Sequence, residues 1–334
     1  MRPIVAIDPQ RHVAHPLHNA ERVWTETSCS IDVWIEVLHP LDLDPVAALA
    51  STLSADFLGD QWRLLKFPLD DLRQLYGLVV DEFSVWRPLL DHIADALDTG
   101  RLLTVEVDSW FLPDTAGRSY HRKHVKSTII PNYINRTGRR MEYFHGTGYY
   151  ELSSNDFDGL FPSYSRGGGL SLTPYVEIVS LEQIIRSDIL PRAIHAAQAH
   201  LIRRPLMNPV EQLGNQLEKN QEKLRLRDAR RFHGYAFATI RQCGATAELA
   251  GSFARWLSTH SDLYLEEAAV SFDKVAREAR SLQFKLSRLT HGRPVDIQPT
   301  IAAMAGCWEA AVGEMTARLC SGSHPDDSVD RLPW

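Results

Sequence analysis

The feature that most constrains the fold is a change in hydrophobic periodicity near residue 180. Up to about residue 165, short apolar runs with the two-residue alternation of strands are mixed with short segments of helical periodicity. Beyond residue 180 the strand-like runs disappear, and long segments with a 3.6-residue period follow one another. The sequence therefore predicts an α+β domain followed by an all-α helical bundle.

The predicted domain boundaries follow from this change. We expect an α+β domain over residues 1–170, a helical bundle over 171–322 and a flexible tail over 323–334. In the first domain, strands are predicted at 102–107, 127–133 and 141–144, and helices at 46–53, 68–77, 88–97 and 153–161. In the second, proline and glycine breaks predict helices at 180–203, 209–242, 246–259, 262–290 and 299–320.

Charge and composition exclude several classes of protein. The 36 lysines and arginines against 42 aspartates and glutamates give a formal net charge of −6, which argues against a general nucleic-acid binder. No glycine-rich nucleotide-binding motif is present, so no cofactor is expected on the chain. No signal-like segment and no run of 18 uncharged apolar residues occur, so neither export nor a membrane span is expected.

The four cysteines also indicate a compartment. They are far apart and form no Cys-x-x-Cys pair, so neither a zinc site nor a disulfide scaffold is predicted. Reduced thiols fit a cytoplasmic protein best. The cysteines are Cys29, Cys243, Cys307 and Cys320.

Cys29 precedes the apolar positions Ile31, Trp34, Ile35 and Leu38, so it is predicted to open a helix. A helix start offers unpaired N–H groups and the positive end of the helix dipole. Both favour the thiolate, which is the reactive form of cysteine. Cys29 is therefore a candidate nucleophile, and the alternative is a small buried hydrophobe.

Polar residues that could act with this cysteine follow about a hundred residues later. The order of a cysteine at an early helix start, a histidine on a strand and a polar group on the next strand is that of papain-like folds. A thiol nucleophile needs a base within hydrogen-bond reach and a third group that orients the base. The candidates for these two roles are His124, Lys126, His145 and Asp108.

Each of these residues also has a structural interpretation. His124 could be an exposed histidine at a strand end, and His145 could be a turn residue beside Gly146. Lys126 could pair across the sheet with Asp108 or Glu106. Asp108 could cap the turn that follows its strand.

The segment Leu103–Pro113, followed by Tyr120 and His124, resembles the butirosin biosynthesis protein H family. In that family a strand ends in an aspartate, an aromatic-Leu-Pro follows, and a histidine-led strand comes next. The resemblance covers roughly residues 20–165. It implies a fold similar to bacteriocin-processing cysteine peptidases and an acyltransferase that moves an acyl group from a carrier-protein thioester to an amine.

The whole chain further resembles an uncharacterised bacterial family, a domain of unknown function. Some members of that family are associated with amino acid:carrier protein ligases, which charge carrier proteins. The resemblance implies an acyl or aminoacyl carrier protein as partner, with such a ligase as a further one. Phosphopantetheine would then belong to the carrier protein.

The sequence departs from the butirosin-type pattern at three positions. The family's histidine position falls on Lys126, and His124 lies two residues earlier on the same strand face. The family's aspartate is replaced by His145. Val23 occupies the place of a side-chain oxyanion donor six residues before Cys29, so backbone N–H groups would have to hold the oxyanion.

Together these features predict a cytoplasmic cysteine-dependent acyltransferase acting on a carrier-protein thioester. Cys29 would accept the acyl group, and His124 or His145 would act as base. Because carrier proteins are acidic, a basic patch at Arg136, Arg139 and Arg140 would make the contact. The alternatives are a cysteine hydrolase or amidase of the same fold and a non-catalytic scaffold that binds a carrier protein or ligase. The helical domain could also mediate a homodimer.

Overall fold

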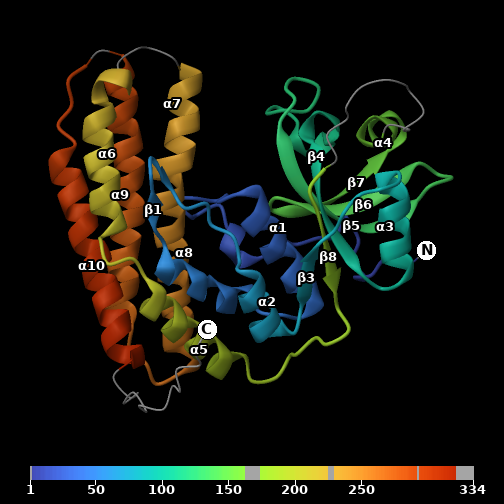
Figure 1. Ribbon diagram of the computed structural model, residues 1–334, viewed down its shortest axis with the longest axis horizontal. Helices are drawn as coiled ribbons and strands as arrows, with labels where there is room; N and C mark the ends of the chain where they lie inside the picture. Colours follow the sequence, from blue (N-terminus) through green and yellow to red (C-terminus); the bar gives the residue numbers. More distant parts are fainter. Residues whose placement is uncertain (1, 162–173, 225–228, 292, 321–334) are drawn as a thin grey trace, which may run out of the picture. The chain divides into compact units, whose positions relative to one another are not determined.

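The computed structural model describes residues 2–161, 174–224, 229–291 and 293–320 (Figure 1). They fall into two compact units. The first unit comprises residues up to 48 together with 65–189 and contains a large sheet, whereas the second comprises 49–64 and the residues from 190 onward and is mostly helical. A sheet-containing region followed by a helical region is the arrangement predicted from periodicity. The predicted boundary at residue 170 and the tail 323–334 lie outside the described residues.

The sheet of the first unit has six strands in the order β3-β8-β4-β5-β6-β7, and every neighbouring pair is antiparallel. The predicted strands at 102–107, 127–133 and 141–144 are confirmed as β4, β5 and β6. The other three are short and were not predicted, because their places depend on pairing with distant strands. The strands are β3 (Val79–Glu82), β4 (Leu102–Asp108), β5 (Lys126–Asn135), β6 (Arg140–His145), β7 (Gly148–Ser153) and β8 (Val176–Ser180).

Helix α1 (Cys29–Leu38) packs against β5 and β6. It begins at Cys29, as predicted, because Ser28 caps it: the Ser28 Oγ accepts a hydrogen bond from the Ile31 N–H at 3.3 Å. Ile31, Ile35 and Leu38 are fully buried and recur at the spacing of one helix face. The sheet therefore holds α1 by its apolar side and fixes the position of its first residue.

Three further helices belong to this unit and match predicted ones: α2 (Leu69–Tyr76), α3 (Leu89–Asp98) and α4 (Ser154–Leu160). Helix α2 ends at Gly77, whose φ of 72° and close approach to the Gln183 carbonyl exclude a larger residue. The predicted helix at 46–53 is wrong in type, because Pro45–Ser54 forms 3-10 turns instead of an α-helix.

The register of β4, β5 and β6 determines which residues share a face of the sheet. Lys126 pairs with Asp108 and Thr128 pairs with Glu106, so these four side chains lie on one face. Ser127 lies between Lys126 and Thr128 along the strand and therefore points to the opposite face.

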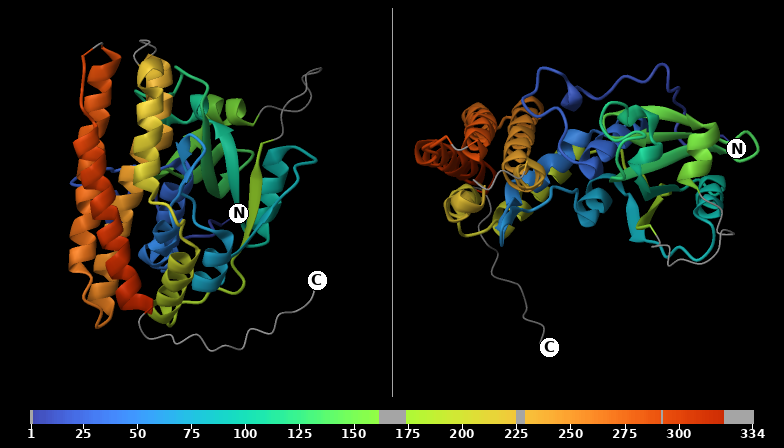
Figure 2. Two further views of the ribbon diagram at one scale, coloured as in Figure 1. Left: turned by 60° about the vertical axis from the view of Figure 1, so that its left-hand side comes forward. Right: turned by 90° about the horizontal axis from the view of Figure 1, so that it is seen from above.

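The second unit contains a short hairpin and a set of helices. The hairpin is β1 (Phe57–Leu58) and β2 (Gln61–Trp62), and its Trp62 packs edge-on against Trp308 at a centroid distance of 5.7 Å. Helices α8, α9 and α10 lie side by side, with α6 against α10 (Figure 2). Within the described residues, no helix is long and apolar enough to cross a membrane. The helices are α5 (Ile189–Arg203), α6 (Pro209–Leu224), α7 (Ala229–Ala236), α8 (Gln242–His260), α9 (Glu266–Thr290) and α10 (Gln298–Cys320).

Two helix boundaries differ from the sequence prediction. The predicted helix 180–203 begins only at Ile189, because β8 extends to Ser180, and the predicted break at Gly244 is wrong. The predicted helix 209–242 covers α6 and α7, and residues 225–228 between them lie outside the described residues. A π-helical turn at Phe237–Arg241 joins α7 to α8 without interruption, and Gly244 is buried inside α8. Packing of a buried helix outweighs the intrinsic cost of one glycine, about 1 kcal/mol.

Candidate functional site

Cys29 is partly exposed at the first position of α1. The Asp32 N–H closes the first turn by donating to the Ser28 carbonyl, and the Ile31 N–H is capped by the Ser28 side chain. In the described part of the chain, the N–H groups of Cys29 and Ser30 make no hydrogen bond. These two donors remain available beside the sulfur, as the predicted oxyanion site requires.

The neighbour of the sulfur is a hydroxyl group. The Cys29 Sγ lies 3.7 Å from the Thr128 Oγ1 on β5, 99 residues away in the chain. No imidazole of the described residues lies within hydrogen-bond reach of this sulfur. The sequence predicted His124 or His145 as the base, with the family's histidine position at Lys126, but the strand position that faces the thiol is Thr128.

Lys126 lies two residues from Thr128 on the same face of β5. Its Nζ donates to the Glu106 Oε1 at 2.5 Å, and Glu106 is the cross-strand partner of Thr128. The pair that was one structural interpretation of Lys126 is therefore present. It also places an ammonium group two residues along β5 from Thr128, the residue that the thiol contacts.

His124 forms a second pair at the end of the same face. Its Nδ1 lies 2.5 Å from the Asp108 Oδ2, and its ring stacks on Trp110 at a centroid distance of 4.5 Å. Burial raises the pKa of Asp108, but His124 and the backbone N–H donors together outweigh it, and the pKa lies below its ordinary value. The His124 side chain is 70% exposed, so it has room to move. Asp108 also accepts from the Trp110 N–H, which is the predicted turn cap.

His145 lies on the other face of the sheet. It is the cross-strand partner of Ile129, and its Nε2 lies 2.6 Å from the Ser127 Oγ. Because Ser127 and Thr128 point to opposite faces, β5 separates His145 from Cys29. The His145 Nδ1 lies instead 2.5 Å from the Asp114 Oδ2. Of the sequence-predicted residues, the structure thus places Cys29, Lys126, Asp108 and His124 on one face and His145 on the other.

The family models match both regions of the chain. The model described as the DUF1839 N-terminal domain matches residues 13–181, and that described as the DUF1839 C-terminal domain matches residues 187–317. The chain belongs to the DUF1839 family. No curated protein matches it.

Beneath α1, the DUF1839 chain carries a buried cluster of histidines and carboxylates that sequence reasoning missed. The Glu36 carboxylate lies 2.8 Å from the His12 Nε2 and 2.5 Å from the His18 Nδ1, and accepts from the His15 N–H at 3.0 Å. The His18 Nε2 lies 3.5 Å from the Asp32 Oδ1. The sequence signal was available: three histidines at three-residue spacing, with Asp32 and Glu36 one helical turn apart.

These contacts set the charges in the cluster. Burial raises the pKa of Glu36, but the imidazoles of His12 and His18 outweigh it and lower the pKa to about 2. Burial lowers the pKa of His18, yet Asp32 and Glu36 together raise it above the ordinary value. Burial raises the pKa of Asp32. The described residues contain no group of three or more His, Cys, Asp or Glu side chains placed to bind a metal ion.

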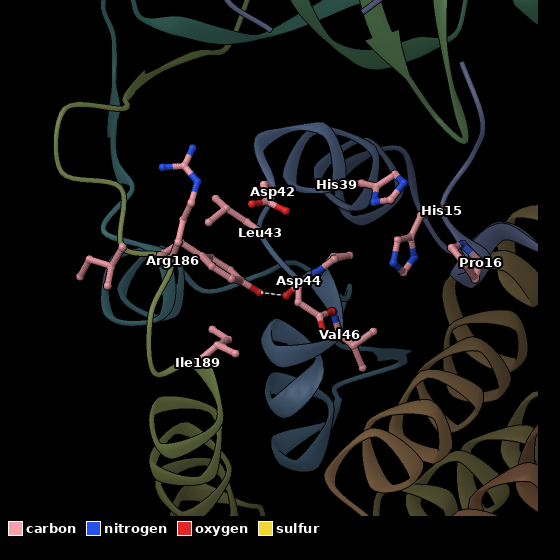
Figure 3. Close-up of a pocket in the computed structure, with 12 residues that line it drawn as sticks. His15, Pro16, His39, Asp42, Leu43, Asp44, Val46, Arg186 and Ile189 are labelled. Atoms are coloured by element: carbon pink, nitrogen blue, oxygen red, sulfur yellow. Dashed lines mark hydrogen bonds between the residues drawn. The ribbon is translucent and has the colours of Figure 1, made fainter. Parts of the chain in front are cut away.

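A pocket of about 490 Å³ opens at the other end of α1 (Figure 3). His15 and His39 meet edge to face in it, and burial together with the nearby His39 lowers the pKa of His15 to about 4. Since α1 has ten residues, the pocket lies roughly 15 Å from Cys29 and does not adjoin the thiol. Its polar lining consists of His15, His39, Asp42, Asp44, Tyr76 and Arg186.

Proposed function

We propose that this DUF1839 chain is a cysteine-dependent acyl or aminoacyl transferase with a papain-like N-terminal domain. The observation that carries the proposal is the environment of Cys29: a partly exposed thiol at a capped helix start, beside two free N–H groups and against a sheet strand. The similarity to the butirosin biosynthesis protein H family supports the same reaction. The proposed donor is an acyl or aminoacyl carrier protein, itself charged by an amino acid:carrier protein ligase.

The first step is a thioester exchange. The Cys29 thiolate attacks the carbonyl carbon of the carrier-protein thioester, a new carbon–sulfur bond forms, and the phosphopantetheine thiolate leaves and takes up a proton. The N–H groups of Cys29 and Ser30 hold the oxyanion. In the second step an amine attacks the acyl-Cys29 thioester, a carbon–nitrogen bond forms as the carbon–sulfur bond breaks, and the proton lost by the amine restores the Cys29 thiol. The chain itself needs no cofactor for either step, because the phosphopantetheine belongs to the partner.

Two groups on the face that Cys29 contacts can assist this reaction, Lys126 by stabilising the thiolate and His124 by accepting the thiol proton. Lys126 is nearer, since it lies two residues from Thr128 and its ammonium group favours a nearby thiolate. His124 lies four residues from Thr128, about 13 Å along the strand, and would have to swing toward the thiol together with its loop. His145 is separated from Cys29 by the strand itself and takes no part in this step.

The decisive experiment is intact-mass analysis after mixing the full chain with acyl-loaded carrier protein. We expect an increase equal to one acyl group, located on Cys29 and absent in Cys29→Ala. Cys307→Ala is the matched control, because Cys307 is also partly exposed but lies on α10. An unchanged mass with every acyl donor would contradict the transferase. Comparing release into water with release to an added amine separates a hydrolase from a transferase.

The basic patch expected to contact the carrier protein is largely neutralised. Arg136 pairs with Asp91, and Arg139 pairs with Asp158. Arg140 lies between Glu142 and Glu151. Because each guanidinium group already faces a carboxylate, these arginines add little to the attraction of an acidic partner.

A second function is favoured by the Thr128 contact. A papain-like domain with a hydroxyl group where the base should be fits a non-catalytic scaffold that binds a carrier protein or ligase. The scaffold predicts that Cys29→Ala binds carrier protein with unchanged affinity, measured by calorimetry, and that no acyl group is transferred. The transferase predicts binding by the same variant but acylation of the wild-type chain, so the two are distinguished by the mass measurement.

A further inference from the structure

The face of the sheet opposite Cys29 holds a hydrogen-bonded chain of three side chains. The Ser127 Oγ lies 2.6 Å from the His145 Nε2, and the His145 Nδ1 lies 2.5 Å from the Asp114 Oδ2. Ser127 and His145 are each 8% exposed, and the Asp114 side chain is 5% exposed. A hydroxyl, an imidazole and a carboxylate are thus connected in that order.

The position of the protons follows from the acceptors. An ionised Asp114 can only accept, and it accepts from the Tyr143 hydroxyl at 2.6 Å as well as from His145. The His145 Nδ1 therefore carries a proton, and in the neutral ring the Nε2 is free to accept from the Ser127 hydroxyl. This is the direction that a serine nucleophile needs, because the base must receive the hydroxyl proton.

A further hydroxyl group lies at the end of the neighbouring strand β4. Ser109 extends the pairing of β4 and β5 by one residue, since its N–H donates to the Val125 carbonyl at 2.9 Å. It lies two residues after Val107, the cross-strand partner of Ser127, where β4 gives way to a 3-10 turn over Ser109–Phe111. Its Oγ is buried and makes no hydrogen bond within the described part of the chain. An unpaired buried donor of this kind suits a developing oxyanion.

We propose that Ser127 is a second nucleophile of this protein and hydrolyses small acyl esters. Its Oγ forms a bond to the acyl carbon, the bond to the leaving alcohol breaks, and the serine proton passes through the His145 Nε2 to the alcohol oxygen. Water then attacks the acyl-serine with His145 again as base, which releases the acid and restores Ser127. Asp114 is a positioning residue that holds the imidazole in the required tautomer. The low exposure of Ser127 and His145 restricts the substrate to small acyl groups.

The test uses diisopropyl fluorophosphate, a small reagent that phosphorylates activated serines with release of fluoride. The full chain carries Cys29→Ala, so that the thiol does not contribute. We expect one adduct, mapped to Ser127 by peptide mass. Asp114→Asn keeps the shape but reverses the hydrogen bond to the Nδ1, so it should slow labelling at least about a hundredfold. Ser119→Ala is the matched control, because Ser119 is also 8% exposed and in the same unit.

A second variant keeps the test valid if Asp114→Asn does not fold, as judged by near-ultraviolet circular dichroism. Ser127→Cys, made in the chain that retains Cys29, places a thiol at the same Nε2, and we expect iodoacetamide to alkylate it about tenfold faster than Cys29 at pH 7. His145→Asn in that background should remove the difference. The proposal is overturned if the folded chain forms no Ser127 adduct, or if labelling is equally fast without Asp114 and His145.

Discussion

On one face of β5, Cys29 lies against a threonine hydroxyl, and on the other, Ser127 lies against an imidazole. The first face has a partly exposed sulfur at a helix start, but the histidine predicted for it, His124, is paired to Asp108 farther along the chain. The second has a complete proton path, but its hydroxyl is a weaker nucleophile and less exposed. Ser127 and Thr128 are adjacent in the sequence, yet they lie on opposite faces of the sheet, because successive side chains of a strand point to opposite sides. Neighbouring residues can therefore belong to two unrelated sites.

The largest expected effect concerns the buried cluster around Glu36, which lies on the same helix, α1, as Cys29. Glu36→Gln removes the charge that His12 and His18 surround, and leaves the raised-pKa His18 with only Asp32 as a carboxylate partner. Breaking a buried charge pair in this way costs about 3 kcal/mol of the free energy of unfolding. Urea unfolding at pH 6 measures it, with Glu182→Gln, an exposed partner of Arg101, as the matched control.

The pH dependence of this loss follows from the lowered pKa of Glu36. Its ordinary value is 4.5 and its folded value about 2, so its contribution is present above 4.5 and is lost as the pH falls through 2. The difference between wild type and Glu36→Gln should therefore be constant from pH 6 to about 5 and shrink below that. A difference that grew on acidification would show that Glu36 is not ionised in the folded chain.

The second effect tests whether a base beside Cys29 is all that this site lacks for reactivity. Thr128→His places an imidazole at the position that now contacts the Cys29 Sγ. A histidine neighbour stabilises the thiolate, so alkylation of Cys29 by iodoacetamide at pH 6.5 should rise about tenfold to a hundredfold. Thr128→Val is the control for the altered packing and should not increase the rate. Equal rates in both variants would mean that position 128 does not control the thiol, and the contrast between the two faces would weaken.

What could be predicted from the sequence was local. The start of α1 at Cys29 depends on a cap one residue away and on apolar spacing within ten residues, and β4, β5 and β6 depend on their own runs. The neighbours of Cys29 depend on how α1 lies on the sheet, across 99 residues of chain. The partner of His145 depends on the register of β5 and β6, which an irregularity between Pro131 and Tyr133 shifts. Such non-local geometry leaves no periodic signal in the sequence.

The smallest expected effect separates chemistry from folding on the Cys29 face. His124 and Asp108 are 70% and 35% exposed in their side chains, and an exposed pair of this kind contributes at most about 1 kcal/mol. His124→Gln should therefore change the free energy of unfolding by less than that amount, as should Lys126→Met, whose side chain is 64% exposed. Because both variants remain folded, acylation of Cys29 in each can be compared directly. The variant that loses acylation identifies the group that activates the Cys29 thiol, and retention of the full rate in both would show that neither group does so, as the scaffold requires.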